Sequence, residues 1–161
     1  MLAVLAAVLA TLWAQWHSPQ RRILRRLAAL EEALEKDGPE DQLATLGRGR
    51  EITRFFAPGF LILAAPYEGR ISSPQELVGA VHRLRSAGTT VAVDFRDVEI
   101  EVRRANDTAD MGLEATVAID LGDGEGRESY RGRLQWVEEE GQWLIQQVEI
   151  LEVLEGGRRL F

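Results

Sequence analysis

The chain has no cysteine and only two histidines, His17 and His82, among its 161 residues. Without cysteine it has no disulfide, no thiol nucleophile and no cysteine-ligated zinc, which is compatible with either redox compartment. Two histidines also exclude a histidine-rich metal site. The net charge of −7 provides no general attraction to nucleic acid. Apolar residues make up 45% of the chain, which is enough for the core of one domain with an appendage.

Charged side chains are missing from residues 1–16, which differ from everything after them. As a helix this segment is apolar on all sides and about 24 Å long, slightly short of a hydrocarbon core of roughly 30 Å. Trp13 and Trp16 lie at its end, where interfacial aromatic residues belong. We therefore expect residues 1–17 to be a membrane anchor or a signal segment; the alternative is a helix buried against protein. No clean cleavage site precedes the arginines that follow, and no basic residue precedes the apolar run.

A helix is predicted to begin at Ser18-Pro19, with serine as its N-cap and proline at the first helical position. The amino-terminal end of this helix, where the helix dipole is positive, carries four arginines, which are Arg21, Arg22, Arg25 and Arg26. They form either a solvated face or a contact with anionic head groups. By the positive-inside rule, these arginines would place the domain on the cytoplasmic side. A small domain behind an N-terminal apolar segment is more often exported, and our expectation leans to export.

Glycine and proline divide the next part of the chain. Two short helices are expected at residues 40–46 and 50–57, separated by glycines and ended by Pro58-Gly59, and a short strand at 60–63. Ser73 and Glu76 form a capping box that begins another helix, which ends at Gly88. His82 lies beside the buried stripe of that helix, either as a half-buried structural histidine or as a catalytic one.

Four long antiparallel strands with two β-bulges are predicted after residue 90. Apolar residues fall on odd positions from 91 to 95 and on even positions from 98 to 102. Side chains of a strand alternate strictly between faces, so one extra residue must lie near Arg96-Asp97. In the last strand the apolar residues also change from odd to even positions, which places a second bulge near Gln146-Gln147. Helices followed by such a meander predict an α+β fold, with the helices on one face of a strongly curved sheet.

Three motifs of the chain resemble the nuclear transport factor 2-like superfamily, including its SnoaL-like branch. They are the turn Phe55–Phe60, the helix entry Gly69–Leu77, and Gly141-x-Trp143-x-Ile145 at the last strand. The resemblance implies a cone-shaped curved antiparallel sheet, with four long strands and one or two short ones, packed on three to four helices. This domain would span residues 18–155 and leave 156–161 as a tail. The superfamily includes dehydratases, isomerases, cyclases, transport adaptors and structural modules of secretion channels, so the fold does not choose the activity.

The resemblance also implies a pocket between the concave face of the sheet and the helices. Enzymes of the superfamily place an Asp-His pair or a single carboxylate there as general acid and base. The concave face expected here has no titratable group, so the candidate catalytic residues are limited to His82, Asp97 and Tyr67. Asp97 is either aimed inward by its bulge or solvated beside Arg96. The expected pocket-lining residues are Phe55, Phe95, Met111, Trp136, Gln146 and Gln147.

These observations favour a membrane-attached binding or scaffold module without catalytic activity. The alternative is a SnoaL-like lyase or isomerase that uses a general acid and base in the cone. The expected membrane-proximal residues are Trp13, Trp16 and the four arginines. We expect no cofactor, because the sequence supplies neither a nucleophile next to a histidine base nor three clustered metal ligands. The expected partners are a membrane, through residues 1–16, and a small apolar ligand. The sequence does not decide whether the chain forms a homodimer, and nucleic acid is not expected.

Overall fold

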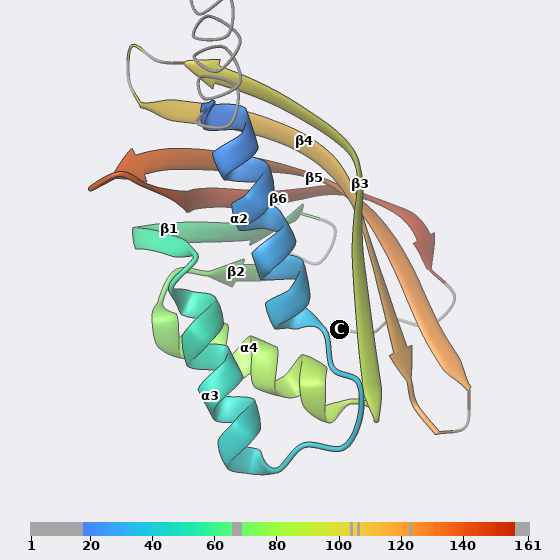
Figure 1. Cartoon of the computed structure of the whole chain (residues 1–161). Helices are drawn as coiled ribbons and strands as arrows, with labels where there is room; N and C mark the ends of the chain where they lie inside the picture. Colours follow the sequence, from blue (N-terminus) through green and yellow to red (C-terminus); the bar gives the residue numbers. More distant parts are fainter. Residues whose placement is uncertain (1–17, 66–68, 104, 106, 123, 157–161) are drawn as a thin grey trace, which may run out of the picture.

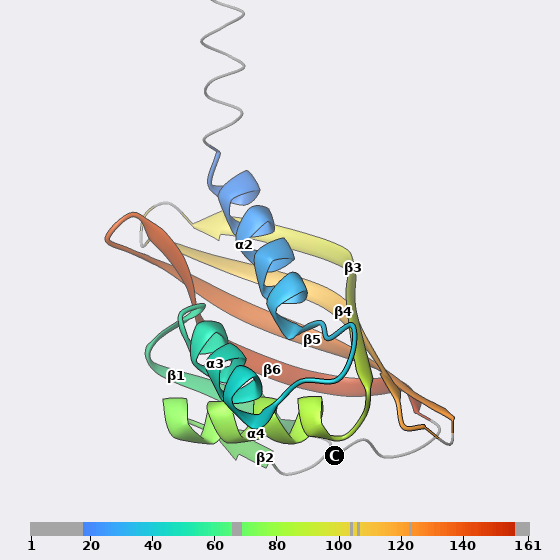
Figure 2. The same cartoon turned by 60° about the horizontal axis from the view of Figure 1, so that its bottom comes forward.

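The computed structural model describes residues 18–65, 69–103, 105, 107–122 and 124–156. Figure 1 shows the described helices on one side of a curved sheet, and the turned view of Figure 2 shows the same arrangement. The predicted anchor and Tyr67 lie outside the described residues. The elements are α2 (Pro19–Leu34), α3 (Gln42–Thr53), β1 (Phe56–Ala64), β2 (Gly69–Ile71), α4 (Pro74–Ser86), β3 (Thr90–Arg103), β4 (Thr108–Asp120), β5 (Glu125–Glu139) and β6 (Gln142–Gly156).

The sheet has six strands in the order β2-β1-β6-β5-β4-β3. Strands β3 to β6 form the predicted antiparallel meander. Strand β1 differs from the expectation of a wholly antiparallel sheet, because it pairs with β6 in parallel. The α+β fold is confirmed, as are the starts of two helices. Ser18 caps α2, and Ser73 with Glu76 forms the capping box of α4.

Both predicted bulges are present. In β3 the register shifts between Arg96 and Glu99, and Asp97 adopts a φ of 49°. In β6 the register shifts beside Gln146, because Gln147 pairs with Gln135 while Ile145 pairs with Trp136. Two further shifts in β6, which were not predicted, leave Leu151 and Leu154 without a partner in register. A bulge bends its strand and increases the twist, so β6 follows a curved path along the cone.

The segment before β1 differs from its prediction. A single helix, α3, runs through both glycines that were expected to separate two helices. Gly49 faces α4, and a Cβ atom at this position would lie 3.0 Å from the Cγ1 atom of Val78. The glycine therefore allows α3 and α4 to approach closely. The chain then enters β1 at Phe56, where residues 56–57 were expected to be helical.

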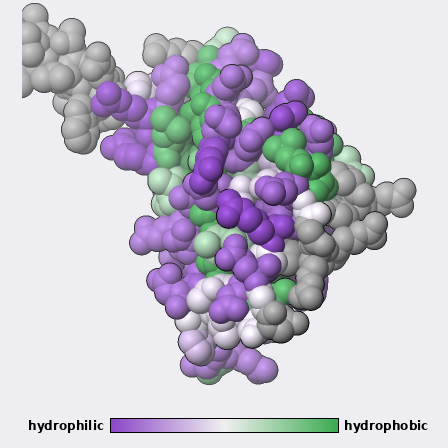
Figure 3. Space-filling model, turned by 90° about the vertical axis from the view of Figure 1, so that its right-hand side faces the viewer, coloured by the Kyte–Doolittle hydropathy of each residue, from purple (hydrophilic) through white to green (hydrophobic). Residues whose placement is uncertain are grey.

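Most of the core lies between the helices and the concave face of the sheet. The larger cluster contains Leu27, Leu113, Trp143 and Ile145. A smaller cluster of Val91, Val93 and Ile119 lies at one end of the sheet, and Leu84 and Val117 pack against it. Leu34 and Phe95 contact both clusters. On the side of the molecule drawn in Figure 3, several apolar patches interrupt a mostly hydrophilic surface.

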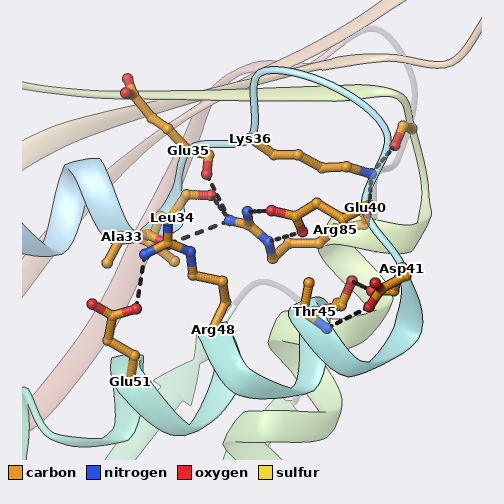
Figure 4. Close-up of polar contacts among 12 residues, drawn as sticks. Ala33, Leu34, Glu35, Lys36, Glu40, Asp41, Thr45, Arg48, Glu51 and Arg85 are labelled. Carbon is orange, nitrogen blue, oxygen red and sulfur yellow. Dashed lines mark hydrogen bonds and ion pairs between the residues drawn. The ribbon is translucent and has the colours of Figure 1, made fainter.

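The C-terminal end of α2 is bound by a buried arginine from α4. Arg85 is 1% exposed, and its Nη1 atom donates to the carbonyl oxygens of the last residues of α2 and its cap, at 3.3 Å, 2.8 Å and 2.7 Å for Ala33, Leu34 and Glu35 (Figure 4). Its Nε and Nη2 atoms donate to the two carboxylate oxygens of Glu40, at 3.0 Å and 2.5 Å. A cation is favourable at this end of a helix, where unpaired carbonyls carry partial negative charge.

The C-terminal end of α4 is bound in a similar way by Lys36. Its Nζ atom donates to the carbonyl oxygens of Arg85 and Gly88, each at 2.7 Å. The backbone of Lys36 pairs with Val91 of β3 through N–O distances of 2.8 Å and 2.9 Å. Arg85 and Lys36 thus fasten α2, α4 and β3 to one another. This connection fixes the spacing of the helices over the concave face, and that spacing leaves room for a cavity.

Candidate binding cavity

An apolar cavity of about 290 Å³ lies between the helices and the concave face of the sheet. Side chains from all three described helices and from five strands surround it, and its accessible wall is entirely apolar. The surrounding residues are Leu30, Leu34, Ile52, Phe56, Ile62, Leu77, Val81, Phe95, Leu113, Ala115, Val117, Tyr130, Gly132, Leu134, Ile145, Val148, Glu149 and Ile150. The bulge at Gln146 lies next to Ile145 and Val148, so the bend of β6 shapes this part of the wall.

A buried carboxylate lies behind one part of the wall. The ring of Tyr130 lines the cavity, and its hydroxyl donates a hydrogen bond to Glu128, which is 2% exposed. The buried residues of β5 fall on even positions, including 128, 130, 134 and 136. Glu128 therefore belongs to the concave face, which was expected to carry no titratable group. The apolar residues Leu134 and Trp136 fall on even positions of this strand. That pattern could have revealed that Glu128 shares their face.

The predicted pocket residues occupy several different places. Phe95 lines the cavity. Phe55, Met111 and Trp136 are buried in the core at 7%, 0% and 1% exposure but do not surround the cavity. Gln146 lies with Trp136 in a separate hollow, and Gln147 pairs in register with Leu61 and Gln135. Of the six predicted residues, Phe95 therefore surrounds the cavity and the other five do not.

The catalytic candidates that the structure describes do not converge. His82 is half-buried on α4 and does not surround the cavity, and its Nδ1 atom has no partner among the described residues. Asp97 is exposed at the bulge, and the neighbouring Arg96 pairs with Asp94. Within residues 18–156, apart from the short gaps, no group of three potential metal ligands is present.

Arg22 and Arg26 hold the start of α2 onto the domain. Arg22 pairs with Glu138 at 2.8 Å and donates to the carbonyl oxygen of Gly141. Arg26 donates to the carbonyl oxygen of Arg54 at 2.6 Å and lies 4.5 Å above the ring of Phe55. Burial lowers the pKa of Arg26. Arg21 and Arg25 are exposed. Among the helices of the described residues, none has the length and apolar character needed to cross a membrane.

No known family profile and no curated protein matches the sequence. Solved structures do match the fold. A putative scytalone dehydratase from Novosphingobium aromaticivorans has a TM-score of 0.65 at 12% identity, covering 87% of this chain and 89% of that one. A protein of the same organism, described as NTF2-like with a cystatin-like fold, has a TM-score of 0.64 at 18% identity, covering 98% and 92%.

The hexachlorocyclohexane dehydrochlorinase LinA-type3 from Novosphingobium barchaimii is also similar, with a TM-score of 0.64 at 8% identity, covering 86% of this chain and 88% of that one. The chain thus has the α+β fold of these structures, one of which is described as cystatin-like. At such identities the likeness extends to the fold alone, and the activities of these enzymes belong to them.

Proposed function

We propose that the domain is a non-catalytic binding module that holds a small apolar molecule in its cone and is attached to a membrane through residues 1–16. The observation that carries the binding role is the cavity of about 290 Å³ with an entirely apolar wall. This volume is at the low end of the roughly 300–1,000 Å³ that is usual for ligand pockets. The ligand class is therefore a small molecule.

The wall favours hydrocarbon over polar groups. A ligand hydroxyl or amide that faces apolar side chains loses its water without gaining a partner, which costs roughly 1–3 kcal/mol. Each methylene group that leaves water gains about 0.8 kcal/mol. The hydroxyl of Tyr130 is directed to Glu128, so it supplies no polar surface inside the cavity. Affinity is therefore expected to rise with the apolar surface of the ligand, up to the volume of the cavity.

Filling the cavity is expected to abolish this binding. In a version of the chain that begins at Ser18, Ala115→Leu adds a branched apolar side chain to the wall, and the affinity for an uncharged fluorescent probe such as N-phenyl-1-naphthylamine should fall at least about tenfold, or roughly 1.4 kcal/mol. Ala118→Leu is the matched control, because residue 118 of β4 points to the opposite face and does not surround the cavity. A fluorescence titration measures both affinities. Equal affinities for the two variants would contradict the proposed site.

A small-molecule lyase or isomerase is the second candidate. The observation in its favour is the hydrogen-bonded pair of Tyr130 and the buried Glu128 beside the cavity. A carboxylate next to a phenol is a workable general base and acid, provided that Tyr130 turns its hydroxyl toward a substrate. Tyr130→Phe removes the hydroxyl and keeps the ring. It should leave the binding of an apolar probe unchanged in either case, and an assay of turnover separates the two functions: if the pair is an acid and base, the variant should lose the turnover that the wild type shows.

The membrane role is supported by the composition of residues 1–16, which contain no charged side chain and end near Trp13 and Trp16. Each fully buried leucine or valine side chain is worth roughly 1.5–3 kcal/mol, so leaving this segment in water is strongly unfavourable. The full chain should float with liposomes in a density gradient, and a version that begins at Ser18 should stay at the bottom. A full chain that remains monomeric and soluble without detergent would contradict the proposed attachment.

A further inference from the structure

A second hollow of about 290 Å³ lies between α2 and the turn that joins β5 to β6. Three arginines of α2 line one side of it, and Gly141, Gln142 and Trp143 line the other. The arginines are Arg22, Arg25 and Arg26. This arginine groove, as we call it, is separate from the apolar cavity, and the two share no surrounding residue.

The groove concentrates positive charge in an acidic protein. The chain has a net charge of −7, yet three guanidinium groups meet here. Glu138 pairs with Arg22, which offsets one of them. The first turn of α2 contains no acidic residue, and the amino-terminal end of a helix is itself electropositive. Of the three, Arg22 lies in the first turn of α2, where a positive charge is unfavourable, and the three guanidinium groups also repel one another. An anion in the groove would relieve that repulsion.

Two of the guanidinium groups are held in position before any ligand arrives. Arg22 is fixed by Glu138 and by the carbonyl oxygen of Gly141. Arg26 is fixed by the carbonyl oxygen of Arg54 and by the ring of Phe55. A guanidinium group has five N–H donors, so these contacts leave others for an additional acceptor. An anion that binds here has less side-chain entropy to overcome than one that must order flexible surface arginines.

We infer that the arginine groove binds a phosphate group. The planar guanidinium fork matches the oxygen atoms of a phosphate, and several such groups in one groove favour an anion with several acceptor oxygens. The phosphate belongs either to a lipid head group or to a soluble phosphate compound. Arg22 lies four residues after Ser18, close in sequence to the segment that we propose to enter the membrane. The lipid source rests on that proposed attachment, whereas the site itself does not.

The test uses the full chain in micelles of an uncharged detergent and follows the indole N–H signal of Trp143 by NMR. Trp143 lines the groove, and its Nε1 atom has no partner among the described residues, so its signal reports on the site. A Trp143→Phe variant assigns the signal. One arm adds inorganic phosphate, and the other adds phosphatidylglycerol to the micelles. We expect a saturable shift of this signal in at least one arm.

Matched charge variants separate a specific site from general attraction. Arg25→Gln and Arg21→Gln each remove one positive charge from the first half of α2, but only Arg25 lines the groove. Arg25→Gln should weaken binding about fivefold, and Arg21→Gln by less than about twofold. A shift with inorganic phosphate alone identifies a soluble source, and a shift with the lipid alone identifies a head group. No saturable shift in either arm, or an equal loss in both variants, would overturn the inference. Binding of phosphate by a chain that does not float with liposomes would retain the site and reject only the membrane attachment.

Discussion

Arg85→Met is expected to lower the free energy of unfolding by roughly 2–4 kcal/mol. The guanidinium group is 1% exposed and donates to three carbonyl oxygens at the end of α2 as well as to Glu40. Methionine keeps much of the apolar stem but removes every one of these donors. The three carbonyls and the carboxylate would then lose their partner. Glu40 is 20% exposed and regains some water, so the expected loss is smaller than for a fully buried ion pair.

Arg83→Met is the matched control for this experiment. It makes the same chemical change on the same helix, but Arg83 is exposed, so the loss should stay within about 0.5 kcal/mol. Urea denaturation monitored by circular dichroism measures the free energy of unfolding of both variants. If the two variants lose the same stability, the network around Arg85 contributes nothing beyond a surface arginine.

The Arg85 variant also has an expected pH signature. The hydrogen bond from Arg85 lowers the pKa of Glu40 in the folded protein. A lowered folded-state pKa means that ionised Glu40 adds stability above its unfolded pKa of about 4.3, and this stability is lost as the pH falls through the folded value. Arg85→Met should therefore lose less stability than the wild type on acidification below about pH 4.3. Glu76 and Asp120, whose pKa values are lowered mainly by backbone hydrogen bonds from Ser72 and Gly122, contribute in both proteins and cancel in the comparison.

Local rules predicted the parts of the fold that depend on neighbouring residues. The change of phase between Phe95 and Val98 located the first bulge, because strand alternation is strict. The bulges at Leu151 and Leu154 could not be found in this way. Residues 150–151 and 153–154 are apolar pairs, so no change of phase can be read there. The two glycines of α3 gave the wrong boundary, because contact between Gly49 and α4 outweighs the weak helix propensity of glycine.

The candidate site was harder to predict than the fold for a geometric reason. Alternation tells which face a side chain occupies, but not how far along the cone it lies. Phe95 and Met111 share the concave face, yet only Phe95 reaches the cavity. Glu128 and Arg85 are exceptions of another kind, since charged residues are almost never fully buried unless they are paired. Their partners, Tyr130 and Glu40, become apparent only in three dimensions.

Ile145→Ala is expected to cost roughly 2–5 kcal/mol of unfolding free energy, from lost transfer energy and from the space that remains. Ile145 is fully buried, pairs in register with Trp136 and Phe56, and lines the apolar cavity. The space left by the truncation would join a cavity that already exists, so small shifts of the neighbouring side chains would not fill it. We therefore expect the cost to lie in the upper half of that range.

Leu144→Ala is the control for this truncation. Leu144 is the preceding residue of β6, points to the opposite face and is only half-buried, so its loss should cost less than about 1.5 kcal/mol. Chemical denaturation gives both values, and a saturating apolar probe supplies a second measurement. The enlarged cavity of the Ile145→Ala variant should be stabilised by a bulkier probe than the wild type accepts, because a ligand that binds only the folded state shifts the unfolding equilibrium. A cost below about 0.5 kcal/mol for Ile145→Ala would place residue 145 on the exposed face and reverse the assignment of the whole strand.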